Sequence, residues 1–147
     1  MEQIKQELLD REVQPTFQRI KIFQYLDENR IHPTVERIYK DIKEAIPTIS
    51  RTTVYNTLDL FNDKGIVQEL TISGTESRYD INTTTHNHFF CKECGEVFDI
   101  ETEAYWKENN IDKVQGNRIE EIHFYFKGIC KDCLEKSDQL STTDQAV

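Results

Sequence analysis

Four cysteines occur as two Cys-x-x-Cys pairs, and their spacing is the clearest sign of chemistry in the sequence. Cys91 and Cys94 form the first pair, Cys130 and Cys133 form the second, and residues 95–129 lie between them. Two such pairs present four thiolates, which complete the tetrahedral shell of a structural Zn²⁺. A closed shell of this kind would hold strands together rather than catalyse a reaction. Four buried free thiols and two redox-active pairs are the alternatives.

A second group of potential metal ligands is centred on His86 and His88. At a spacing of two residues, both imidazoles share one side of a strand and can bind one metal. Asp80 ends the expected strand before them, and Asp99 lies in the strand that follows. Imidazole and carboxylate donors suit Fe, Mn, Zn, Co or Ni. A surface or capping role for each of these side chains is the alternative.

The first half of the chain favours helices followed by a hairpin. Apolar residues recur at helical spacing, Thr34 and Ser50 are plausible N-caps, and Pro47 and Gly65 are helix-ending residues. The pattern predicts helices over residues 2–10, 16–29 and 34–46, a fourth from Ser50 to Gly65, and strands over 66–72 and 77–81. This is the order of a winged helix-turn-helix domain.

The helix beginning at Ser50 is the expected recognition helix. Polar residues fill its first two turns, where such helices reach base edges in the major groove. These residues are Arg51, Thr52, Thr53, Tyr55 and Asn56. Their side chains can contact thymine methyl groups, bases or phosphates. A plain helical bundle with a solvated polar face is the alternative.

The second half favours a small α/β unit. Short apolar runs predict strands over residues 89–91 and 97–100, the composition of 103–114 favours a helix, and 118–129 alternates apolar and polar residues. One apolar sheet face would need a partner, which a homodimer supplies. Residues 136–147 have little to bury and are expected to be a loose tail. The overall prediction is an α+β chain with a DNA-binding domain over 1–81, a zinc-containing dimerisation domain over 82–135 and a flexible tail.

Composition limits the function classes. No apolar run is long enough for a membrane span, the N-terminus lacks a secretory signal, and the four cysteines fit a reducing cytoplasm. The net charge of −9 argues against nucleic acid, but the net negative charge concentrates in the second half. A local basic face in the first half can still bind phosphate.

Several motifs, taken together and in order, resemble the ferric uptake regulator (Fur) superfamily of bacterial metal-dependent repressors over about residues 5–135. The matching segments are Pro15-Thr16-x-Gln18-Arg19, His32-Pro33-Thr34, Ile49 to Leu58, His86-x-His88-x-x-Cys91-x-x-Cys94-Gly95 and Cys130-x-x-Cys133. The resemblance implies an N-terminal winged helix joined to a C-terminal α/β dimerisation domain. It also implies a homodimer that binds a palindromic double-stranded DNA operator.

The resemblance also implies roles for single residues. Cys91, Cys94, Cys130 and Cys133 match structural zinc ligands, and Thr53 and Tyr55 match residues that meet DNA; Arg19, in the first matching segment, joins the expected DNA-binding residues. The regulatory Fe(II) or Mn(II) ligands would be His32, Asp80, His86, His88 and Asp99. Aspartate at both carboxylate positions is typical of the superfamily's peroxide-responsive repressors.

Three residues depart from the broader family pattern. Thr85 and Asn87 replace a histidine and an acidic residue that help to form a further metal site in many members. That site is therefore expected to be absent, which leaves His123 a structural role in its strand. Asn56 replaces a frequent arginine, so the operator sequence stays open.

The sequence therefore predicts a peroxide-sensing, metal-dependent repressor and not an enzyme. A repressor that responds to iron or zinc supply would use the same site plan and is the main alternative. A metalloenzyme with an open His/Asp site is a remote one, because the sequence offers no obvious nucleophile, general base or cofactor loop.

Overall fold

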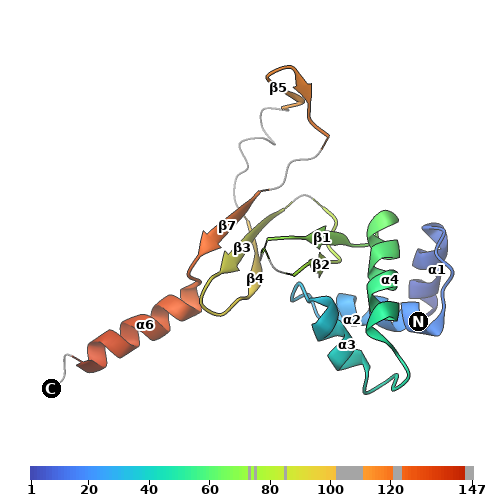
Figure 1. The fold of residues 1–147 in the computed structure, drawn as a ribbon, viewed down its shortest axis with the longest axis horizontal. Helices are drawn as coiled ribbons and strands as arrows, with labels where there is room; N and C mark the ends of the chain where they lie inside the picture. The colour runs from blue at the N-terminus through green and yellow to red at the C-terminus, as the bar shows by residue number, and fades with distance from the viewer. Residues whose placement is uncertain (73, 75, 85, 102–110, 121–123, 145–147) are drawn as a thin grey trace. The chain divides into compact units, whose positions relative to one another are not determined.

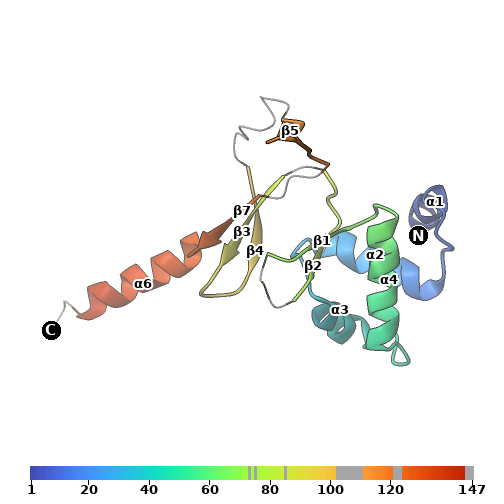
Figure 2. The ribbon, with the colours of Figure 1, turned by 45° about the horizontal axis from the view of Figure 1, so that its top comes forward.

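The computed structural model describes residues 1–72, 74, 76–84, 86–101, 111–120 and 124–144. The chain forms two compact units, Met1–Thr84 and Thr85–Val147. Four helices and a two-stranded hairpin make up the first unit, and the second contains a three-stranded sheet and a helix (Figures 1 and 2). The predicted α+β class is confirmed.

The first unit begins with α1 (Glu2–Asp10), α2 (Phe17–Glu28), α3 (Val35–Ile42) and α4 (Arg51–Asp63). The side chains of Thr16, Thr34 and Ser50 each accept a hydrogen bond from the backbone N–H three residues later. These caps satisfy N–H groups that have no partner inside the helix, so short polar residues fix where each helix starts.

A hairpin follows α4. Strand β1 (Gln68–Leu70) pairs antiparallel with β2 (Arg78–Asp80), and both views show the hairpin beside α4. The Tyr79 N–H donates to the Pro33 carbonyl at 3.1 Å, and Thr34 bridges to Arg78. The hairpin is therefore tied to the loop before α3, in the position of a wing.

One apolar core joins the helices of this unit to the hairpin. Its fully buried members come from every helix and from the start of the hairpin, and include Leu8, Ile22, Ile38, Leu58 and Phe61. Phe23 and Phe61 meet edge to face, with ring centroids 6.3 Å apart. The helical periodicity identified Ile20, Phe23 and Leu26 of α2 as buried but missed Ile22, and Phe17 at the start of the same pattern is 59% exposed.

The second unit is built on a sheet of order β4-β3-β7. Strand β3 (Asn87–Cys91) pairs antiparallel with β4 (Val97–Ile100) and parallel with β7 (Tyr125–Gly128). Helix α6 (Lys131–Asp144) follows directly after β7. The sheet places Cys91 at the end of its central strand and Cys130 between β7 and α6.

Three predicted elements of the first unit are shorter than expected. Helix α3 ends at Ile42 instead of reaching Ile46, and Ile46 nevertheless stays buried. Strands predicted over 66–72 and 77–81 are paired only over 68–70 and 78–80. Apolar runs predict burial better than they predict where pairing ends.

The second unit differs more from prediction. Of the helix expected over 103–114, residues 103–110 lie outside the described part of the chain. Strand β5 (Lys113–Val114) instead pairs with β6 (Asn117–Arg118). Gln115 and Gly116 both have positive φ, which is the backbone of a tight hairpin turn.

The last two predictions for this unit were also partly wrong. The strand expected over 118–129 is divided between β6 and β7, and residues 121–123 lie outside the described residues. Residues 136–144, expected to be a loose tail, belong to α6. Residues 131–144 contain no Gly or Pro to end a helix, and Asp132 lies favourably in its first turn.

Among the helices that the structure describes, none combines the length and apolar character needed to cross a membrane.

Candidate metal centres and nucleic-acid interface

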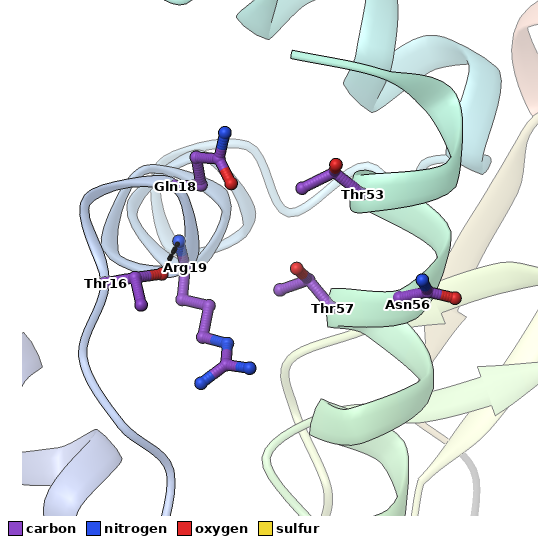
Figure 3. A pocket seen from close by; sticks show the side chains of 6 residues that line it. All are labelled: Thr16, Gln18, Arg19, Thr53, Asn56 and Thr57. Atoms are coloured by element: carbon purple, nitrogen blue, oxygen red, sulfur yellow. Dashed lines mark hydrogen bonds between the residues drawn. The ribbon is translucent and has the colours of Figure 1, made fainter.

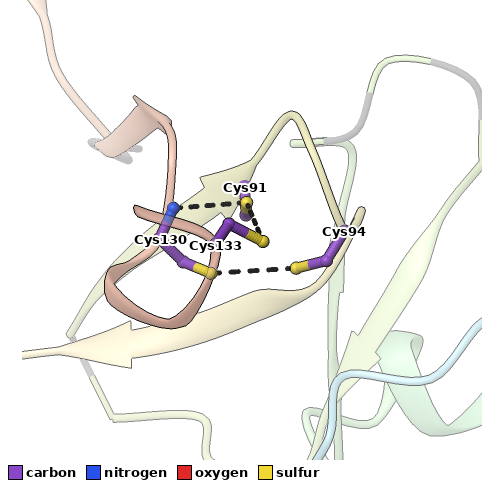
Figure 4. A group of neighbouring side chains, drawn as sticks. All are labelled: Cys91, Cys94, Cys130 and Cys133. Carbon is purple, nitrogen blue, oxygen red and sulfur yellow. Dashed lines mark hydrogen bonds between the residues drawn. The ribbon is translucent and has the colours of Figure 1, made fainter. Parts of the chain in front are cut away.

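Four cysteine side chains converge in the second unit (Figure 4). Cys91 ends β3, Cys94 lies in the turn toward β4, Cys130 precedes α6 and Cys133 lies in its first turn. Gly95, with a φ of +73°, provides the left-handed backbone that the first turn requires. The parallel pairing of β3 with β7 explains why two pairs so distant in sequence meet.

The sulfur positions fit a tetrahedral ion. All four Sγ atoms lie within 4.8 Å of one another, and Cys91–Cys133 and Cys94–Cys130 are each separated by 3.9 Å. A zinc–sulfur bond of about 2.3 Å implies sulfur–sulfur edges of about 3.8 Å in a tetrahedron. No disulfide joins these four cysteines. The arrangement fits Zn²⁺ and leaves no ligand position open.

Electrostatics favour a cation at this site. Burial raises the pKa of Cys91, but hydrogen bonds from the Cys94, Cys130 and Glu93 backbone outweigh it and lower the pKa to about 6. The pKa of Cys133 is raised to about 12, first by its hydrogen bond with Cys130 and then by burial. Neighbouring sulfurs therefore resist a second negative charge, and a divalent cation removes that penalty.

His32 and Asp80 meet inside the first unit. His32 Nε2 lies 3.2 Å from Asp80 Oδ2, and both side chains are more than 90% buried. His32 has a φ of +52°, which is uncommon for a residue other than glycine. Arg78 Nη1 donates to the His32 carbonyl at 3.3 Å. The wing strand and the loop before α3 thus hold an imidazole and a carboxylate together, a pair that the resemblance implied and the spacing alone did not.

His86, His88 and Asp99 meet inside the second unit. Asp99 Oδ1 lies 3.1 Å from His86 Nε2 and 3.5 Å from His88 Nε2, and the two imidazole rings are 4.4 Å apart. His88 and Asp99 are directly opposite each other in the β3–β4 pairing. The period of two and the antiparallel register therefore aim two nitrogens and one carboxylate at the same point, as the sequence predicted. Such donors suit Fe, Mn or Zn.

The polar residues predicted at the start of the fourth helix lie in the first two turns of α4. Tyr55 is 54% exposed, Thr52 and Asn56 are exposed, and Val54 and Leu58 face the core. Thr53 is half-buried, and its hydroxyl lies 2.9 Å from the Ser50 hydroxyl, beside the helix cap. Helix α4 therefore offers a polar face led by an aromatic ring.

Arg51 is held by α3, which the sequence did not indicate. Its Nε and Nη2 donate to Glu36 at 2.7 and 2.9 Å, and its guanidinium lies 4.3 Å from the centre of the Tyr39 ring. The hydrogen bond from Arg51 lowers the pKa of Glu36 below its usual range. Arg51 thus fixes the start of α4 against α3. Only the tertiary packing brings Glu36 and Arg51 together, so no local pattern would have found the pair.

Arg19 lies in the first turns of α2, facing α4. Its Nη1 donates to the Gln14 carbonyl at 3.0 Å. Gln18 and Thr57, which were not among the predicted residues, share a pocket with it. Residues His123 and Thr85 lie outside the described part of the chain, and Asn87 is buried in β3.

The chain matches the family model described as "Ferric uptake regulator family" over residues 10–128. The peroxide-responsive repressor PerR of Staphylococcus aureus is 36% identical over 128 residues, and the match covers 84% of both proteins.

Solved structures show the same fold. The ferric uptake regulator of Pseudomonas aeruginosa with manganese has a TM-score of 0.69 at 25% identity, and covers 86% of this chain and 97% of that one. The Vibrio cholerae ferric uptake regulator gives 0.69 at 27% identity, covering 86% and 98%. A structure of PerR from Streptococcus pyogenes, described as the structural basis for peroxide sensing and gene regulation by that protein, has a TM-score of 0.50 at 28% identity. The match covers 89% of this chain and 90% of that one.

Proposed function

The chain belongs to the ferric uptake regulator family, and from that premise we propose that it is a metal-dependent transcriptional repressor that senses peroxide. The observation that carries this proposal is the convergence of His86 and His88 on the single carboxylate of Asp99. The likeness to PerR supports peroxide as the signal. The relatives are regulators, so the metalloenzyme alternative is not favoured.

The regulatory site combines the two ligand groups into one shell. His32 and Asp80 come from the DNA-binding unit, and His86, His88 and Asp99 come from the second unit. Three imidazoles and two carboxylates suit Fe(II) or Mn(II) and require no thiolate. Support comes from the pairing inside each unit, because each pair already points its donor atoms at one another.

This division of ligands explains control of DNA binding. His32 and Asp80 of one unit and His86, His88 and Asp99 of the other would hold the metal together, and this shared ligation would set the distance between two α4 helices in a homodimer. Two recognition helices one helical turn apart match the halves of a palindromic operator. Because the metal binds the closed arrangement better than open ones, it shifts the population toward DNA binding.

Peroxide would reverse this arrangement. Bound Fe(II) supplies the chemistry by which peroxide oxidises a ligating imidazole. Oxidation of His32, His86 or His88 would weaken that side chain as a ligand, so the shell would lose a donor and would no longer join the two units. The operator is then released. The protein would act in the cytoplasm, where its four thiols stay available to zinc.

The direct test is operator binding by protein loaded separately with Fe(II), Mn(II) and Zn(II), before and after anaerobic addition of peroxide. We expect only the iron form to lose DNA, with one added oxygen on a peptide that carries His32, His86 or His88 in mass spectrometry. If iron-loaded protein keeps its operator and no histidine peptide gains oxygen, the peroxide proposal fails. Release by metal depletion alone would then support the supply-sensing alternative.

Asp99→Glu sharpens the test. The longer side chain keeps the charge and the oxygen donors, so metal-dependent DNA binding should largely remain. The altered geometry of the Asp99 carboxylate beside His86 and His88 should reduce peroxide release and histidine oxidation. Asp112→Glu is the matched control, because Asp112 is exposed and contacts neither histidine among the described residues. Equal behaviour of Asp99→Glu and the control would remove Asp99 from the sensor.

A further inference from the structure

A single arginine carries the charge at the start of the recognition helix. Arg51 is the one charged residue among positions 51–56. The side chains of α4 that are labelled in Figure 3 carry only hydroxyl and amide groups, and the labelled cation, Arg19, belongs to α2. The charge that the first two turns of α4 present to a duplex therefore depends on what Arg51 contacts.

Arg51 is held by Glu36 of α3 through both carboxylate oxygens. Arg51 Nε donates to Glu36 Oε2 at 2.7 Å, and Nη2 donates to Oε1 at 2.9 Å. Two such bonds between a guanidinium and a carboxylate are charge-assisted, and they fix the two planar groups against each other. The guanidinium carbon also lies 4.3 Å from the centre of the Tyr39 ring, a cation–π contact that holds it from one face.

The pair lies at the surface of the first unit. The side chains of Arg51 and Glu36 are 62% and 58% exposed. Exposed ion pairs add little to folding stability, because water and salt screen the attraction between the charges. The main consequence of this pair is therefore the charge of the surface at the start of α4, and loss of Glu36 should leave the stability of the unit close to wild type.

Glu36 supplies the negative charge that the start of α4 lacks. The first turn of α4 contains no acidic residue, and the helix dipole places a partial positive charge there. The hydrogen bond from Arg51 lowers the pKa of Glu36, and the same bond raises the pKa of Arg51. Both groups thus remain ionised at neutral pH, and together they add no net charge beside the residues that would read the bases.

We propose that Glu36 limits the sequence-independent DNA affinity of this repressor by neutralising Arg51. The inference rests on the proposed function, because it takes α4 as the DNA-reading helix. An unpaired arginine at the start of α4 would bind a backbone phosphate of any duplex, and such contacts carry no sequence information. With Arg51 bound to Glu36, the contacts of each α4 depend instead on uncharged side chains such as Thr52, Tyr55 and Asn56.

This neutralisation suits a repressor that must leave its operator. The regulatory metal would set the separation of two α4 helices, whereas the phosphate affinity of each helix does not depend on that separation. Strong sequence-independent binding would therefore keep the metal-free dimer on DNA. A neutral start of α4 makes tight binding require both helices at once, and that requirement is the property that the metal can control.

Glu36→Gln removes the negative charge and keeps a side-chain oxygen that can accept from Arg51. The affinity of the Mn(II)-loaded dimer is measured for the operator and for an unrelated duplex over a range of salt. We expect the variant to bind both duplexes about 3- to 10-fold more tightly for each subunit in contact, with a salt slope steeper by about 0.9 per subunit. Metal-free protein should show the same gain on the unrelated duplex, and urea unfolding should match wild type.

Glu44→Gln is the matched control, because it removes the same charge just after α3. Glu44 is exposed and has no ion pair among the described residues, so its affinities and salt slope should equal those of wild type. Arg51→Gln leaves Glu36 unpaired and should weaken binding to both duplexes with a shallower slope. The double variant Glu36→Gln with Arg51→Gln lacks both charges and should return to the wild-type slope.

The outcomes separate this inference from the proposed function. Wild-type affinity and slope for Glu36→Gln on the unrelated duplex would overturn the role of Glu36, as would an equal gain for Glu44→Gln, which would assign the effect to net charge. Weaker operator binding by Glu36→Gln, without a gain on the unrelated duplex, would also overturn it and would make Glu36 a residue that positions α4. Equal binding of wild type to both duplexes, with and without metal, would overturn the repressor proposal, and the unrelated duplex would still decide the role of Glu36. Absence of binding to either duplex by wild type and by Glu36→Gln would overturn both.

Discussion

The two units of the chain are stabilised in different ways. The first buries a continuous apolar core that draws on all four of its helices and on the wing. In the second, the buried apolar residues among those described are Cys91, Val97 and Cys130, two of which are candidate zinc ligands. The first unit can fold by hydrophobic burial alone, whereas a unit this small needs a metal or a partner to hold it.

Exposed side chains show the same contrast. Phe98, Phe124, Tyr125 and Phe126 are each between 37% and 47% exposed in or beside the sheet of the second unit. Solvent-exposed aromatics on one small sheet are typical of a surface that another protein covers. The second unit therefore holds both the candidate zinc site and the expected dimer surface. Loss of zinc or of the dimer should destabilise the second unit without unfolding the first.

The largest expected effect comes from removing zinc. Cys91→Ser should abolish zinc binding and unfold the second unit, because structural zinc contributes on the order of 10 kcal/mol to folding. The helices of the first unit should keep their amide resonances. Zinc content by elemental analysis and a ¹H–¹⁵N spectrum measure both effects.

Lys92→Ala is the control for this substitution, since Lys92 lies exposed between the two cysteines of the first pair. A Cys91→Ser protein that retains one zinc per subunit and a folded second unit would overturn the four-thiolate assignment. Collapse of the first unit as well would show that the two units are not independently stable.

This contrast also explains what could be predicted from sequence. In the first unit, caps such as Thr16 and Ser50 and the apolar spacing along α4 act locally, so helix positions and buried faces followed from the sequence. In the second, the β3–β7 pairing is non-local, and the helical tail carries no apolar periodicity. The sequence predicted the meeting of the cysteines from metal chemistry rather than from strand order, and it missed the Glu36–Arg51 pair because only packing creates it.

The second prediction tests the core of the first unit. Leu58→Ala removes a fully buried side chain on α4 and should destabilise this unit by about 2–5 kcal/mol. Zinc content should not change. Leu9→Ala, at a 50% exposed position on α1, is the control and should have little effect. Urea denaturation followed by circular dichroism gives the difference; a stability equal to that of the control would show that the core does not hold this unit.

The third prediction concerns the exposed aromatics. Phe126 and Phe124 meet edge to face at 5.0 Å. Phe126→Ala should weaken the homodimer by about 1–2 kcal/mol, or roughly 5- to 30-fold in dissociation constant, with zinc retained. Lys113→Ala, exposed on β5, is the control. Sedimentation equilibrium measures the constant, and a wild-type value for Phe126→Ala would place the dimer surface elsewhere.

The smallest expected effect comes from a polar contact between α2 and α3. The Tyr25 hydroxyl donates to Asp41 at 2.7 Å, and Arg37 donates to the same oxygen at 3.0 Å. Burial, followed by the hydrogen bond to Asp41, raises the pKa of Tyr25 to about 12. Tyr25→Phe should cost about 0.5–1 kcal/mol near neutral pH, the low end for a hydrogen bond, because the contact is partly exposed.

The pH dependence separates this hydrogen bond from simple packing. The pKa of Tyr25 in the folded state lies above its ordinary value of 10, so the folded state retains the proton. The contribution of Tyr25 is therefore fully present below pH 10 and is lost as the pH rises toward 12. Tyr79, whose pKa is also raised to about 12, contributes to the same decline and remains in the variant. The stability of Tyr25→Phe should consequently fall less steeply than that of wild type above pH 10. Identical curves of stability against pH for Tyr25→Phe and wild type would mean that the hydrogen bond contributes nothing. The apolar core alone would then set the stability of the first unit, unlike the second unit, which depends on metal.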